Sequence, residues 1–358
     1  MNYHEIYKNN MNYKSLGKSD IKVSTIGLGT MTWGEQNSEK EAFDQMDYAQ
    51  DAGVNFFDTA ELYPVPPSSK TRGETSRIIG RWIKNKRNRN KIIIADKIAG
   101  RSSMDWFREN SEQTRLNKSQ ICFALDRSLK DLDTDYIDLY QLHWPDRPIN
   151  VFSGLEYVHK ETEENNTILE VIETLEESIK KGKIRSFGIS NETPWGTSEY
   201  LKFSAIKKLS RVVSIQNPYN LLNRSFEVGL SEISIRENVG LLAYSPLASG
   251  TLSGKYLDGK LPEGSRLKLF GNRYPRYRTP NSESAIKEYI KIANTYNLDP
   301  CQMAIKFCEI KPFVTSVLIG ATKMDQLKLN IDSVNIELNN KILEDINKVQ
   351  LVYSNPCP

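Results

Sequence analysis

The chain has 358 residues, of which 39% are hydrophobic and 26% are charged, a composition that excludes disordered and collagen-like proteins. Its 48 Lys and Arg residues nearly balance its 45 Asp and Glu residues, so the net charge of +3 gives no reason to expect nucleic acid or an anionic membrane as a partner. No apolar run approaches the ~20 residues of a membrane-spanning helix.

Short apolar β-rich segments alternate with amphipathic helical segments from residue 21 onward, a pattern typical of parallel βαβ units. We predict strands at residues 25–29, 55–59, 91–97, 136–143, 184–190, 212–217, 240–245 and 317–320. We predict helices at residues 38–52, 74–84, 118–132, 167–181, 198–209, 225–238, 282–297 and 300–309.

This order of elements favours a (β/α)8 TIM barrel, with residues 11–358 as a single domain after a short extension at 1–10. Residues 13–16 and 21–24 flank a GKSD turn and predict a β-hairpin that plugs one end of the barrel. Long loops at 99–117, 145–166 and 247–281 each follow a strand, so they belong to the C-terminal face, where such barrels bind ligands. An open doubly wound sheet is the competing fold, but GLGTMTWG lacks the GxGxxG spacing that it would use.

Four polar residues mark the C-terminal ends of the predicted strands. Asp58 and Lys97 end the second and third strands, Tyr63 follows the second, and His143 ends the fourth, so all four are expected on one face of the barrel. Carbonyl reduction needs an acid that protonates the developing alkoxide, and a tyrosine needs a close cation for that role. Each residue alone has an ordinary structural explanation, as a cap, a rim aromatic or a strand end. The set in this order favours catalysis.

The sequence resembles the aldo-keto reductase family from about residue 11 to its end. The resemblance is carried by GLGTMTWG, FFDTAELY, ADK, LYQLHWPD, GKIRSFGISN, IQNPYNLLNR, AYSPLASGTLSGKY and IGATKMDQLKLN, and LYPVPP and NLLNRSFEVG are similar to the Tas-type reductases. It implies an NADPH-dependent reduction of aldehydes or ketones to alcohols. It also implies roles for Tyr63 as the proton donor, Lys97 as the cation that favours its phenolate, Asp58 as the partner of Lys97, and His143 as the residue that orients the carbonyl.

Asp96 departs from the family pattern, in which a small hydroxylated residue commonly precedes this lysine. Strand alternation points Asp96 away from the barrel interior, so its charge needs a partner on the helix side or water. Without one, it could perturb Lys97.

The resemblance also implies a binding site for NADPH or NADP+. Ser190, Asn191 and Gln216 would bind the nicotinamide carboxamide, and Tyr244 would stack on the ring. The pyrophosphate would lie against Ser245, Pro246, Leu247, Gly250 and Lys255. The adenosine end would lie against Gly320, Thr322, Gln326 and Asn330. Further contacts are expected from Gly29, Thr30, Met31 and Asp58. NADPH is favoured over NADH because cations are available to a 2′-phosphate at Lys255, Arg266 and Lys323.

A small-molecule carbonyl is the expected partner of a cytoplasmic monomer or small homo-oligomer. We expect substrate contacts from Trp33, Tyr63, His143 and Trp144. Aromatic residues there suit a hydrophobic carbonyl, whereas arginines at 147, 276 and 278 suit an anionic one, and the sequence does not choose between them. The histidines and cysteines show no metal-ligand or CxxC spacing, so we expect no metal and reduced thiols.

Three other functions have weaker support. Residues 256–260 match the YxxxK of short-chain dehydrogenases, but the glycine-rich turn that such enzymes need is missing. A barrel glycosidase would place carboxylates at the ends of strands four and seven, where this chain has His143 and Tyr244. A redox-sensing regulatory protein that resembles potassium-channel β-subunits, with bound NADPH and little turnover, is the main alternative, because fold does not fix function.

Overall fold

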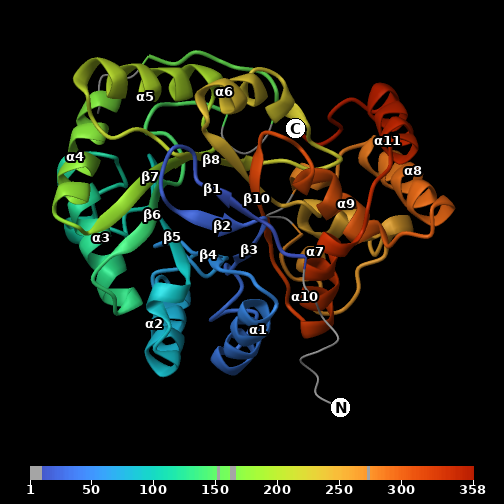
Figure 1. Cartoon of the computed structure of the whole chain (residues 1–358), viewed down its shortest axis with the longest axis horizontal. Coiled ribbons are helices and arrows are strands. Elements are labelled where there is room, and N and C mark those ends of the chain that lie inside the picture. The colour runs from blue at the N-terminus through green and yellow to red at the C-terminus, as the bar shows by residue number, and fades with distance from the viewer. Residues whose placement is uncertain (1–9, 151–153, 162–166, 272–274) are drawn as a thin grey trace.

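Eight parallel strands close into a barrel in the computed structural model, in the spatial order β10-β3-β4-β5-β6-β7-β8-β9 (Figure 1). The strands are β3 (Ile26–Gly29), β4 (Phe56–Asp58), β5 (Ile93–Ile98), β6 (Ile137–Leu142), β7 (Ile184–Ser190), β8 (Ser214–Pro218), β9 (Gly240–Tyr244) and β10 (Val314–Ile319). The predicted (β/α)8 TIM barrel is confirmed. The structure describes residues 10–150, 154–161, 167–271 and 275–358, so nearly all of the expected extension and parts of two expected loops lie outside it.

A β-hairpin of β1 (Tyr13–Ser15) and β2 (Lys22–Ser24) precedes the barrel, as predicted. Leu16 and Val23 of this hairpin are fully buried against Phe56 and other side chains of the barrel interior, so the hairpin seals the N-terminal end of the barrel. Gly17 makes the close approach possible. It has a φ of +54°, and a Cβ there would lie 2.6 Å from the Val213 carbonyl oxygen.

Helices surround the barrel and cover the outer faces of its strands (Figure 1). They are α1 (Glu39–Asp51), α2 (Glu74–Lys86), α3 (Lys118–Leu132), α4 (Ile168–Lys180), α5 (Pro194–Lys207), α6 (Leu230–Glu237), α7 (Arg266–Phe270), α8 (Ser282–Thr295), α9 (Pro300–Glu309), α10 (Met324–Ile331) and α11 (Asn340–Val352). Capping boxes start α1 at Ser38 and α4 at Thr167. None of the helices in the described ranges is long and apolar enough to span a membrane.

Several element boundaries differ from the predicted ones. Helix α5 begins at Pro194 rather than residue 198, because Thr193 caps it and proline suits the first helical position. The helix predicted at 225–238 is divided into a 3-10 turn and α6, since Gly229, between them, has a φ of +89°. Helices α7, α10 and α11 lie outside the predicted helix ranges, and α7 lies within the segment 247–281 that was expected to be irregular.

Candidate active site

A buried ion pair occupies the C-terminal end of the barrel. Asp58 is the last residue of β4 and Lys97 is the penultimate residue of β5. Lys97 Nζ donates to Asp58 Oδ2 over 2.6 Å and to the Thr59 carbonyl oxygen over 2.7 Å. Their side chains are 0% and 3% exposed, so this pair is removed from water and its attraction is little screened.

Tyr63 and His143 lie beside this pair. Lys97 Nζ is 4.9 Å from the centroid of the Tyr63 ring, and the Tyr63 and His143 rings meet edge to face, with centroids 5.9 Å apart. Burial alone would lower the pKa of Lys97, but Asp58 and Tyr63 together raise it above the usual value. The structure thus brings together all four predicted residues, with a charged Lys97 between the carboxylate and the tyrosine.

His143 is uncharged in this setting. Burial, and then the positive charge of Lys97, hold its pKa well below the usual value. Its Nδ1 is buried and has no hydrogen-bond partner among the described residues. The neutral ring is therefore better protonated at Nε2, which makes it a hydrogen-bond donor rather than an acid.

Two glutamines, one on β6 and one on β8, hold the other oxygen of Asp58 across the barrel interior. Gln141 Nε2 donates to Asp58 Oδ1 over 3.0 Å, and Gln216 Nε2 donates to the same atom over 2.8 Å. Gln216 Nε2 also donates to Gln141 Oε1 over 3.1 Å, so its amide nitrogen is fully used. Gln141 was not predicted as a site residue. Its signal was its position two residues before His143, which places both on the same face of a strand.

Asp96 points away from the interior, as strand alternation predicted. Its Oδ1 accepts from the backbone N–H of Lys97 over 2.8 Å, while its buried Oδ2 has no hydrogen-bond partner among the residues that the structure describes, and Ser128 of α3 is close by. Burial raises the pKa of Asp96 to about 7, although Ser128 and the Lys97 N–H oppose the shift. No cation on the helix side compensates it within the described ranges.

Apolar side chains line one side of Tyr63. Trp144 and Phe107 are buried in a cluster with Leu62, against which Tyr63 packs. The Trp144 indole N–H donates to the Arg101 carbonyl oxygen over 2.8 Å, so the ring is fixed. Trp144 therefore belongs to the apolar cluster beside Tyr63, and its substrate contact stays a prediction.

Trp33 requires a correction. It is fully buried in the hydrophobic core, its indole N–H donates to Gln45 of α1 over 3.0 Å, and its carbonyl oxygen accepts from Thr75 of α2 over 2.7 Å. This side chain therefore packs α1 and α2 against the barrel. We remove it from the expected substrate contacts.

The residues expected at the nicotinamide adjoin Asp58 and His143. Ser190 Oγ and the Asn191 N–H both donate to the Gln216 carbonyl oxygen, over 2.7 and 3.0 Å. Asn191 Nδ2 donates to the His143 carbonyl oxygen over 2.8 Å, and Tyr244 Oη donates to Asn191 Oδ1 over 2.7 Å. The ends of β6, β7, β8 and β9 thus form one hydrogen-bonded wall.

The segment after β9 turns its backbone in an unusual way. Ser245, Ala248, Ser249 and Gly250 all have positive φ values between +49° and +88°. Successive residues of this kind can point backbone N–H groups into one concavity, which suits an anion such as a pyrophosphate. Lys255 Nζ lies 3.0 Å from where a Gly250 Cβ would be, so glycine leaves room for the ammonium there.

The residues expected at the adenosine lie around the start of α10. Gln326 Oε1 accepts from the Thr322 N–H over 3.2 Å, and Asn330 Nδ2 donates to the Gly320 carbonyl oxygen over 3.5 Å. Lys323 is exposed at the N-cap position of α10. Anions bind favourably at such a helix start. The donors present therefore fit a dinucleotide that carries several phosphates.

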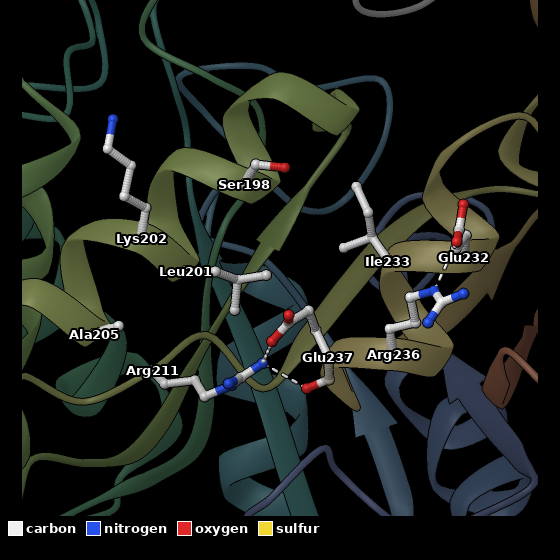
Figure 2. A pocket seen from close by; sticks show the side chains of 9 residues that line it. All are labelled: Ser198, Leu201, Lys202, Ala205, Arg211, Glu232, Ile233, Arg236 and Glu237. Atoms are coloured by element: carbon white, nitrogen blue, oxygen red, sulfur yellow. Dashed lines mark hydrogen bonds and ion pairs between the residues drawn. The ribbon is translucent and has the colours of Figure 1, made fainter.

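A separate pocket lies between α5 and α6 on the outside of the barrel (Figure 2). Its charged side chains neutralise one another, since Arg211 pairs with Glu237 over 2.9 Å and Arg236 pairs with Glu232 over 2.6 Å. None of the predicted site residues lines it. This pocket is not the candidate active site.

Comparison with known proteins agrees with the fold. The model of the aldo/keto reductase family matches residues 25–350. The chain is 48% identical to Protein tas of Escherichia coli (strain K12), over 97% of this chain and 100% of that protein. It is 30% identical to the aldo-keto reductase YhdN of Bacillus subtilis (strain 168), over 95% and 93% of the two chains. It is also 30% identical to a probable voltage-gated potassium channel subunit beta of Arabidopsis thaliana, over 91% and 92%.

Proposed function

The chain belongs to the aldo/keto reductase family, and from that premise we propose that it reduces aldehydes or ketones to alcohols with NADPH, with Tyr63 as the proton donor. The observation that carries this proposal is the buried Lys97–Asp58 pair of 2.6 Å, whose ammonium lies 4.9 Å from the Tyr63 ring. When bound, NADPH would supply the hydride.

Each side chain of the group has a task in this proposal. Tyr63 gives its phenolic proton to the oxygen of the carbonyl as that oxygen gains negative charge. The Lys97 ammonium stabilises the phenolate that remains, and Asp58 keeps the ammonium charged and in place. His143, neutral and protonated at Nε2, donates to the carbonyl oxygen and orients it. Trp144 excludes water from this side of Tyr63.

The cofactor would be held by residues of this chain along the rim. Gln216 is suited to the nicotinamide amide through its Oε1, because both hydrogens of its Nε2 are already used within the barrel. Ser190 and Asn191 complete that contact, and Tyr244 offers its ring face. Lys255, Arg266 and Lys323 would favour NADPH over NADH by pairing with its 2′-phosphate.

NADPH oxidation by the purified protein, across a panel of aromatic, aliphatic and sugar aldehydes and ketones, tests the proposal. Tyr63→Phe should abolish multiple turnover while NADPH still quenches tryptophan fluorescence. Tyr296→Phe, at the C-terminal cap of the outer helix α8, should retain full activity. Failure to bind NADPH would refute the proposal. Tight NADPH binding without turnover of any carbonyl would favour the second candidate, a redox-sensing regulator, which the likeness to the Arabidopsis channel subunit supports.

A further inference from the structure

We propose that Arg276 binds an anionic group, a carboxylate or a phosphate, on the carbonyl substrate, an inference that rests on the proposed reduction. Arg276 lies in the 3-10 turn Pro275–Tyr277, within the long segment that follows β9. Its guanidinium hydrogen-bonds to the side chains of Tyr244 and Tyr277. This segment therefore brings a cation to the end of the barrel where the candidate site lies.

The contacts of Tyr244 place Arg276 close to the catalytic group. Tyr244 Oη, which Arg276 contacts, also donates to Asn191 Oδ1 over 2.7 Å. Asn191 in turn donates to the carbonyl oxygen of His143 over 2.8 Å. Tyr244 and Asn191 thus connect Arg276 to His143 through hydrogen bonds along this wall. It reaches the wall from the segment that follows β9, at the C-terminal end of the barrel, where such barrels bind ligands.

No carboxylate among the described residues compensates the charge of Arg276. Arg276 forms no ion pair with a carboxylate in the described part of the chain, and its Nε is buried without a hydrogen-bond partner. Its tyrosine partners are neutral, because burial raises the pKa of Tyr244 and of Tyr277 above the usual value. A partly buried cation without a counter-charge is unfavourable. A carboxylate or phosphate would compensate it, and the guanidinium can bind either with two parallel hydrogen bonds.

The other two arginines expected near the pocket do not offer such a site. Arg147 Nη1 donates to Glu192 Oε2 over 3.0 Å, Nη2 donates to Thr193 Oγ1 over 3.0 Å, and the guanidinium lies 4.9 Å from the Trp195 ring centroid. Its charge is already paired. Arg278 is exposed to solvent, where an ionic contact contributes little. Arg276 is therefore the arginine of the three that favours an anionic substrate.

Two aldehydes that differ in charge provide the test: 4-carboxybenzaldehyde and its methyl ester. Wild type should prefer the carboxylate in kcat/KM. Arg276→Gln should reduce kcat/KM for the carboxylate roughly 10- to 100-fold, as expected for the loss of one charge-assisted interaction, and leave the ester and the Kd for NADPH unchanged. Arg276→Lys keeps the charge but cannot form two parallel hydrogen bonds, so its kcat/KM for the carboxylate should lie between those of wild type and Arg276→Gln. Arg278→Gln should behave as wild type.

Several outcomes would overturn this inference. One is a carboxylate preference that persists in Arg276→Gln, and another is an equal loss of kcat/KM for the carboxylate in Arg278→Gln. A third is weaker NADPH binding by Arg276→Gln with an unchanged carboxylate preference, which would assign Arg276 to the cofactor phosphates. If wild type reduces neither aldehyde, the proposed reduction is in question, and calorimetry with 4-carboxybenzyl alcohol and NADP+ still tests Arg276. Binding that Arg276→Gln abolishes supports the inference, and no binding by wild type contradicts it. Thermal unfolding checks that each variant is folded. If Arg276→Gln is not folded, the carboxylate preference of Arg276→Lys decides the question.

Discussion

Replacing Asp96 with Asn is expected to stabilise the protein at alkaline pH. Burial raises the pKa of Asp96 to about 7 in the folded protein, whereas its ordinary value is 3.8. Because the folded pKa is the higher one, the carboxyl group favours folding in full below pH 3.8, and this contribution is lost as the pH rises to about 7. Above that pH the wild type holds a buried carboxylate that has no ion-pair partner in the described part of the chain.

The size of the effect follows from this difference in pKa. A difference of about 3 pKa units corresponds to about 4 kcal/mol of lost stability, of which about 3 kcal/mol is lost between pH 5 and pH 8. Asparagine does not titrate, and it keeps the oxygen that accepts from the Lys97 N–H. The free energy of unfolding of Asp96→Asn, relative to wild type, should therefore rise by about 3 kcal/mol between these two pH values.

Equilibrium urea unfolding at pH 5 and at pH 8 measures this difference. Asp44→Asn is the matched control, since Asp44 pairs with Lys40 on the surface of α1, where both side chains are more than half exposed. The control should change stability by less than about 1 kcal/mol at either pH. A gain for Asp96→Asn that is equal at both pH values, or a loss at pH 8, would refute the reasoning.

Three further substitutions test other parts of the structure. Gln141→Leu removes one donor from Asp58, so steady-state kinetics should show kcat lowered by roughly 10-fold with the Kd for NADPH unchanged, as one neutral hydrogen bond implies; an effect on KM alone would contradict this. In the wild type the Arg108 side chain is 2% exposed, and its Nη1 and Nη2 each lie 2.8 Å from a carboxylate oxygen of Glu61. Glu61→Gln removes this counter-charge, so urea unfolding should show a loss of stability of about 3–5 kcal/mol. A loss below about 1 kcal/mol would argue against a tight pair. Trp33→Ala should cost about 3–5 kcal/mol of stability, while KM for the carbonyl stays unchanged in the folded variant; a selective rise in KM would return Trp33 to the substrate pocket.

The sequence was sufficient to predict the barrel because most residues of the parallel strands are buried and most of the long helices have an apolar side. It was less informative where buried residues are polar. Strand β10 begins at Val314 rather than residue 317, since Thr315 and Ser316 are buried inside the strand although their side chains are hydrophilic. The first residue of a helix was likewise hard to predict where a proline begins the helix, as at Pro194.

Site residues were predictable where a strand end positions them. Asp58, Lys97 and His143 each lie at or beside the end of a strand, so alternation and topology were enough to bring them together. Loop residues lack such a constraint. Trp33 lies only four residues after β3, yet its side chain turns into the core. Whether Arg276 has a counter-charge depends on packing between distant segments, which no local pattern encodes.

Adjacent residues of β5 show that partners, rather than burial, decide where charge resides in this barrel. Lys97 and Asp96 are both fully buried. Lys97 has Asp58 at 2.6 Å, and its pKa rises above the usual value, so it stays charged. Asp96 has no ion-pair partner among the described residues, and burial raises its pKa to about 7. Below pH 7, a protonated Asp96 leaves Asp58 as the single carboxylate paired with Lys97. Above pH 7, a second carboxylate beside Lys97 would compete with the Tyr63 phenolate for the ammonium. The rate of reduction should therefore fall as the pH passes about 7, and Asp96→Asn should remove that part of the pH dependence of kcat.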